Sequence, residues 1–138
     1  MIKNNYDISA SLRISSKVLD VSDITNILDL KPKKTLNKGE IISFKSPIKR
    51  LRQESKCLYD SGLESDASLD EHLAKLTNLL EIYREQFVEL LNDCSRDICC
   101  SYTTYSGQGG IALDHNLYPI LNEFKVDIYL DLFSIEDS

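Results

Sequence analysis

The feature that most constrains this fold is a long amphipathic stretch in the middle of the chain. Ser68 and Glu71 form a capping box, in which each side chain satisfies a free amide at the start of a helix. Apolar residues then recur every three or four positions, which predicts a helix of about six turns with one apolar stripe. One such stripe needs a second layer to cover it, so the rest of the chain must supply that layer. The stripe consists of Leu69, Leu73, Leu76, Leu80, Tyr83, Phe87 and Leu90.

Segments with strict alternation of apolar and polar residues predict that this second layer is a sheet. Residues 6–14, 96–104 and 125–133 alternate in this way, as expected for strands with one buried face. Weaker patterns predict two further strands, at 40–45 and 57–59. A short helix begins after the N-cap Asp20 and ends near Leu30 because Pro32 follows. Another is expected over 119–124, with Pro119 in its first position.

These elements predict an α+β protein, a two-layer sandwich with a mostly antiparallel five-stranded sheet and helices on one face. The expected order is β-α-β-β-α-β-α-β, whose first six elements match the ferredoxin-like order. We expect a single domain over residues 1–138 with its core at about 6–133. An unpaired sheet edge at the fifth strand leaves a homodimer open.

Two stretches of the sequence resemble a bacterial family known as domain of unknown function 4279. "ASLRISSKVLDVSDITNILDLKPKKTLNKGE" resembles the opening strand, helix and Lys-Gly-Glu loop of that family, and "SLDEHLAKLTNLLEIYREQF" resembles its long helix. The resemblance covers about residues 6–133. It departs from the family in one respect, since many relatives have a tryptophan near the Lys-Gly loop and this chain has none. The resemblance implies no established activity, and it leaves an antitoxin or immunity role open.

Charge is distributed very unevenly along the chain. Between Lys31 and Lys56 there are nine basic and two acidic residues, a balance of +7, whereas the whole chain carries −6 and the remainder therefore −13. Such segregation produces a local field that steers charged partners. We therefore predict a non-enzymatic interaction module that docks a protein with an acidic surface. The expected docking residues are Lys33, Lys34, Lys38, Lys49, Arg50 and Arg52.

Two other functions compete with protein docking. The same basic residues suit nucleic acid, but only Phe44 and Tyr59 offer nearby aromatic rings for stacking, and the pI is about 4.9. A small-molecule sensor with a pocket between sheet and helices is the other alternative. Nucleotide binding is disfavoured, because the lysine-rich loop follows a helix and the glycine-rich segment 106–110 opens no full helix.

Catalytic and metal-binding patterns are weak. The four cysteines lack zinc spacing and are expected to be reduced, mostly buried thiols. His72 is expected to be partly exposed at a helix start, and His115 beside Asp114 resembles a cap. We therefore expect no enzyme activity, cofactor or metal. Because the N-terminus lacks a signal peptide and no apolar run approaches ~20 residues, we expect a soluble cytoplasmic protein.

Overall fold

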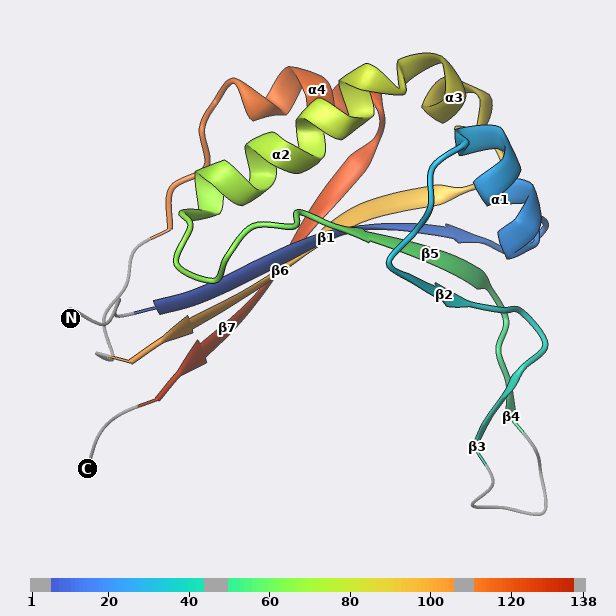
Figure 1. Cartoon of the computed structure of the whole chain (residues 1–138), viewed down its shortest axis with the longest axis horizontal. Helices are drawn as coiled ribbons and strands as arrows, with labels where there is room; N and C mark the ends of the chain where they lie inside the picture. Colours follow the sequence, from blue (N-terminus) through green and yellow to red (C-terminus); the bar gives the residue numbers. More distant parts are fainter. Residues whose placement is uncertain (1–5, 44–49, 106–110, 136–138) are drawn as a thin grey trace.

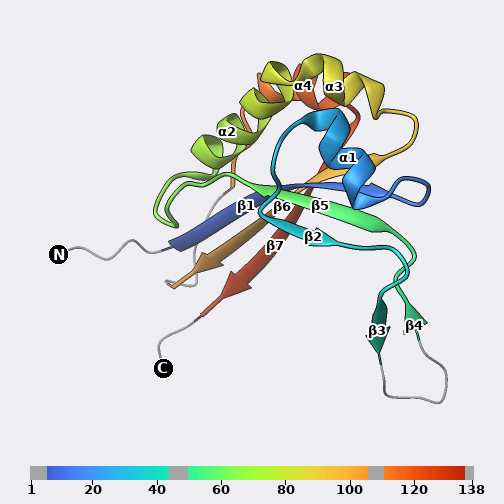
Figure 2. The ribbon, with the colours of Figure 1, turned by 45° about the vertical axis from the view of Figure 1, so that its right-hand side comes forward.

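The computed structural model in Figure 1 describes residues 6–43, 50–105 and 111–135. Four helices cover one face of a five-stranded sheet, and a two-stranded hairpin extends away from it (Figures 1 and 2). The α+β class is therefore confirmed. In chain order, the elements are β1 (Tyr6–Ser16), α1 (Val21–Leu28), β2 (Lys34–Leu36), β3 (Ile41–Ser43), β4 (Arg50–Leu51), β5 (Ser55–Asp60), α2 (Leu69–Ile82), α3 (Arg84–Glu89), β6 (Ser95–Thr104), α4 (Leu117–Glu123) and β7 (Val126–Ser134).

The sheet is mixed: three of its four strand pairings are antiparallel and one is parallel, and the ferredoxin-like order expected from the sequence is not confirmed. The strand order is β2-β5-β1-β6-β7. Strand β1 is antiparallel to both β5 and β6, whereas β7 runs parallel to β6. Parallel neighbours need a crossover connection, and α4 lies on the one that joins β6 to β7. The element order also differs from the expected one, since β2, β4 and α3 are additional elements.

The lysine-rich segment, expected to be only a loop, contains the edge strand β2. Thr35 of β2 pairs with Cys57 of β5, and the backbone amide of Lys33 donates to the carbonyl of Leu58 at 2.8 Å. The strand expected at 40–45 lies instead in the separate hairpin, where Ile41 pairs with Leu51. Gly39 allows this departure from the sheet, because its φ of 88° is strained for other residues.

The core lies between the sheet and the helix layer. Alternate residues of β1 are buried against α2, whose start is capped by Ser68 through a 3.1 Å bond from the Glu71 amide. The single long helix expected here is interrupted at Tyr83, where φ is −104° and ψ is 32°. The break redirects the chain so that the ring of Phe87 packs edge-on against Phe124, with centroids 6.3 Å apart. Within the described residues, no helix has the length and apolar character needed to cross a membrane.

Arg96 is a buried cation that holds the ends of two helices. Its guanidinium donates to the carbonyls of Phe124 at 2.8 Å and Cys94 at 2.7 Å, with a longer contact of 3.4 Å to that of Leu90. Leu90 and Phe124 are the C-caps of α3 and α4. Carbonyls at helix C-termini lack intrahelical donors and attract cations. Arg96 therefore fixes the chain at the point where it enters β7.

Candidate functional site: a basic groove beside the hairpin

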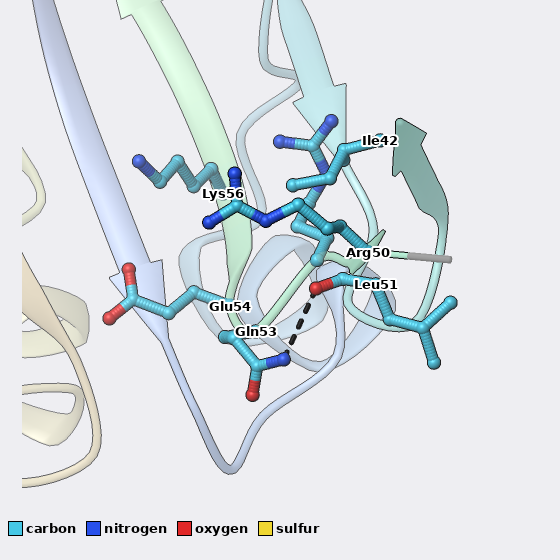
Figure 3. A pocket seen from close by; sticks show the side chains of 7 residues that line it. Ile42, Arg50, Leu51, Gln53, Glu54 and Lys56 are labelled. Atoms are coloured by element: carbon cyan, nitrogen blue, oxygen red, sulfur yellow. Dashed lines mark hydrogen bonds between the residues drawn. The ribbon is translucent and has the colours of Figure 1, made fainter. Parts of the chain in front are cut away.

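The strongest candidate site is a groove where the β3–β4 hairpin joins the sheet. Its volume is about 550 Å³, within the range of ligand and docking sites. The side chains around it come from β3, β4, the segment leading into β5 and the start of β5 itself (Figure 3). We call it the basic groove; its lining residues are Ile42, Arg50, Leu51, Arg52, Gln53, Glu54 and Lys56.

Backbone hydrogen bonds hold the groove in shape. The amide of Gly39 donates to the carbonyl of Arg52 at 2.9 Å, and the amide of Arg52 donates to the carbonyl of Glu40 at 2.8 Å. The side-chain amide of Gln53 donates to the carbonyl of Leu51 at 3.1 Å, as the dashed line in Figure 3 marks. The two arms of the hairpin are thus fixed at its base, directly beside the groove.

The groove combines positive charge with exposed apolar surface. It holds three cations, Arg50, Arg52 and Lys56, against the single carboxylate of Glu54. Within the part of the chain that the structure describes, none of these three cations forms an ion pair. The Nε atom of Arg52 is buried and has no hydrogen-bond partner there. Beside these charges, the side chains of Ile42 and Leu51 are 50% and 48% exposed.

The six predicted docking residues are divided by the structure. Arg50 and Arg52 lie in the groove. Lys33 forms an ion pair with Asp60 at 2.5 Å, and the Lys38 ammonium donates to the carbonyl of Lys17 at 2.7 Å, so both cations have intramolecular partners. Lys34 is exposed on β2, outside the groove lining, and Lys49 lies outside the described residues.

Lys56 is a groove residue that the sequence-based set omitted. It belongs to the basic segment, but its place beside Arg50 and Arg52 depends on the turn between the hairpin and β5. Its neighbours in the sheet are Leu36 of β2 and Ser15 of β1, which place it on the open face of the sheet. Burial alternates along β5, with Ser55, Cys57 and Tyr59 buried on one face and Lys56 on the other.

A buried pair, Ser61 and His72, was not expected from the sequence. The Ser61 hydroxyl and the Nδ1 atom of His72 are 2.6 Å apart. The exposure expected for His72 is wrong: the residue is fully buried, because it shares the apolar stripe of α2 with Leu69 and Leu76. Its Nε2 atom has no partner among the described residues, and both residues of the pair are buried.

The cysteines are free thiols held at low reactivity. Cys57, Cys94 and Cys100 are buried, and burial raises the pKa of Cys57 and of Cys100 to about 11. Burial also raises the pKa of the more accessible Cys99, although Arg13 acts in the opposite direction. Thiols need a lowered pKa to act as nucleophiles or metal ligands at neutral pH. In the described ranges, no three metal-ligating side chains cluster together.

A second pocket lies between the sheet and the start of α2. Its volume is about 230 Å³, below the usual range of about 300–1,000 Å³ for small-molecule sites. Tyr6 and Tyr102 stack at its border with ring centroids 6.0 Å apart. This pocket has the location expected for the alternative function, a small-molecule sensor. The basic groove is larger and more strongly charged.

Together, these features define a small α+β protein whose helix-covered sheet carries a basic groove beside one edge. A family model described as Domain of unknown function (DUF4279) matches residues 4–134, nearly the entire chain, so the protein belongs to this family. The resemblance drawn from the two sequence stretches is thereby confirmed. Neither a curated protein nor a solved structure matches the chain.

Proposed function

We propose that the protein is a non-enzymatic docking module that binds an acidic segment of a protein partner in the basic groove. The observation that carries this proposal is the combination of three cations with two exposed aliphatic side chains in one groove. A partner segment that alternates carboxylates with apolar residues is complementary to both properties. Blocking the active surface of a toxin, as an antitoxin or immunity protein does, is one outcome that such docking allows.

The cations supply orientation and association rate, and the aliphatic side chains supply burial. A local excess of positive charge attracts an acidic partner during diffusional encounter. At contact, Arg50 and Arg52 can each present a planar fork of donors to a carboxylate. Ile42 and Leu51 then lose exposed apolar area, which is worth about 25 cal/mol per Å². The Nε of Arg52, which has no partner within the described chain, would gain one.

Nucleic acid fits this groove less well than an acidic peptide. Single-stranded nucleic acid is bound largely by stacking bases on aromatic rings, and none of the seven lining residues is aromatic. Glu54 also brings a carboxylate into the groove, which repels phosphate. Two of the lysines that gave the segment its basic character, Lys33 and Lys38, are already engaged within the chain.

The test is charge reversal in the groove with a matched control. The triple variant Arg50→Glu, Arg52→Glu and Lys56→Glu alters the groove, whereas Lys17→Glu, Lys75→Glu and Lys125→Glu makes the same charge change at exposed positions elsewhere. Each tagged protein is titrated with a peptide of alternating glutamate and leucine and with a single-stranded oligonucleotide. Affinity capture from a cell lysate, with and without nuclease, follows with the same three proteins.

We expect the wild type and the control variant to bind the peptide, with affinity falling as salt rises, and the groove variant to lose binding at least tenfold. Equal binding by the groove variant and the control contradicts the proposal, because the position of the cations in the groove would then make no difference to binding. Stronger binding of the oligonucleotide, or capture that nuclease abolishes, assigns the groove to nucleic acid and overturns protein docking.

A further inference from the structure

We propose that the free edge of β7 pairs with the same strand of a second copy of this chain, antiparallel about a two-fold axis through Leu130. The proposal is independent of the basic groove, which lies at the opposite side of the sheet (Figure 1). It rests on the backbone, the exposed side chains and the charges of β7 and the residue that follows it.

Strand β7 is long and, within the described residues, lacks a neighbour on one side. It spans nine residues, pairs with β6 and ends the strand order. Such an edge presents unpaired backbone donors and acceptors to any extended chain of matching shape. The structure also shows which of these groups face outwards.

The direction of the β7 backbone follows from one hydrogen bond. The amide of Ile135 donates to the carbonyl of Thr104 at 2.9 Å, so Ile135 is directed towards β6. Backbone groups alternate in direction along a strand, and the odd-numbered residues of β7 are therefore bonded to β6. The amides and carbonyls of Ile128, Leu130 and Leu132 consequently point away from the sheet and are available to a second strand.

The same edge carries a concentration of exposed apolar side chains. Leu132 is 62% exposed and Phe133 is 55% exposed. Tyr129 and Ile135 are exposed as well, and the four lie within seven consecutive residues. Leu132 lies on the helix-covered face and the other three on the open face, so exposed apolar side chains flank this edge on both faces. Residues 126–135 contain no lysine or arginine, the residues that commonly protect an edge from pairing.

The two aspartates of β7 select the register. Pairing the entire strand Val126–Ser134 with itself puts Leu130 opposite Leu130 of the second copy. Asp131 then faces Tyr129, and Asp127 faces Phe133, so no carboxylates are opposed. Moving the axis by one residue to Tyr129 or Asp131 places aspartates directly opposite each other, which is destabilising. The register with the most hydrogen bonds is thus also free of charge repulsion.

This pairing extends the core across the dimer. In the proposed register Ile128 faces Leu132 of the second copy on the helix-covered side. The even-numbered residues of both copies of β7 then share one face of the sheet. Both helix layers therefore lie on the same side of a continuous sheet. The two basic grooves remain at the two outer edges. A dimer would therefore present two docking sites, and it would bind a multivalent acidic partner with avidity.

Two measurements test the pairing. Sedimentation equilibrium of the wild type is expected to give twice the chain mass of 15.7 kDa. Leu132→Lys is expected to give the single-chain mass. Ile82→Lys changes a similarly exposed residue on α2 and is expected to remain dimeric. Circular dichroism checks that both variants are folded. A wild type that is monomeric at every concentration, or an unchanged mass for folded Leu132→Lys, overturns edge pairing.

The register is tested by disulfide trapping in a Cys99→Ser background, where the three remaining native cysteines are buried. Leu130→Cys is expected to cross-link with added oxidised glutathione, because residues opposed in a hydrogen-bonded pair have Cα atoms about 5.5 Å apart. Leu132→Cys is the control: its Cα lies four residues, or about 13 Å, from its counterpart and is expected not to cross-link. Cross-linking of Leu132→Cys in place of Leu130→Cys overturns the proposed axis. The groove charge-reversal variant should still dimerise, so either proposal can fail alone.

Discussion

The two edges of the sheet are built in opposite ways. Strand β2 has three residues, includes the exposed Lys34 and continues into a hairpin that leaves the sheet. Strand β7 has nine residues and exposes Leu132 and Phe133. One edge is short and cationic, and the other is long and apolar.

The contrast shows how one small sheet can carry two kinds of contact surface. A short edge with lysines resists strand pairing, and the chain beyond it is free to form a charged groove. A long edge with few charges favours pairing, and its two aspartates restrict the register of that pairing. Charge at one edge thus selects an anionic partner, whereas backbone geometry at the other selects an identical strand.

The largest effect is expected from Arg96→Ala, which removes the side chain that holds the entry to β7 at the apolar edge. Several buried carbonyls lose a charged donor, and we expect a loss of about 3 kcal/mol in the free energy of unfolding. Arg13→Ala is the control, because its 2.5 Å pair with Asp97 lies on the open face and is worth about 1 kcal/mol or less. Urea unfolding measures both. Equal losses would show that Arg96 has no special role in holding β7.

A second prediction concerns alkaline pH and the thiols one strand inside each edge. Cys57 pairs with Thr35 of β2, and Cys100 pairs with Leu130 of β7. Burial raises the pKa of each from 9.0 to about 11. Above about pH 9 the unfolded chain releases thiol protons that the folded chain keeps. The contribution of these two thiols to stability is therefore constant below that pH and falls as pH rises.

The expected loss is on the order of 2 kcal/mol for each thiol between pH 9 and pH 11. Urea unfolding at about pH 9 and about pH 11 measures it. Cys57→Ala and Cys100→Ala should each reduce the pH dependence. A variant whose stability keeps the full pH dependence would show that the replaced thiol has the same pKa in the folded and unfolded chain. That thiol would then not contribute to the loss of stability at alkaline pH.

The smallest effect is expected from Lys34→Val, which makes the β2 edge more like the β7 edge. We expect no change in mass by sedimentation equilibrium and a stability change within about 0.5 kcal/mol, because three residues are too short to template a stable pairing. Higher oligomers of this variant would show that the lysine, and not the length of β2, protects this edge.

Local patterns predicted much of the fold. The Ser68 cap, the alternation of β1 and the end of α1 before Pro32 depend on neighbours in sequence, and all three are present. Pro119 lies two residues inside α4 and not at its first position, which is still within the first turn, where amides lack partners. The parallel direction of β7 was not predicted, because alternation is the same in parallel and antiparallel strands.

The candidate site was only partly predictable. Sequence counting located the basic segment, and Arg50 and Arg52 from the predicted set do line the groove. It did not separate them from Lys33 and Lys38, whose partners, Asp60 and the Lys17 carbonyl, lie 27 and 21 residues away in the chain. Contacts over such separations leave no local signal.

The sequence by itself thus determined the class of fold, the family and the segregation of charge, because these depend on composition and short-range periodicity. Only the tertiary structure decided which cations are available in the groove, that His72 is buried and that β7 is an apolar edge. These properties arise when distant segments pack together and remove some groups from water while leaving others exposed.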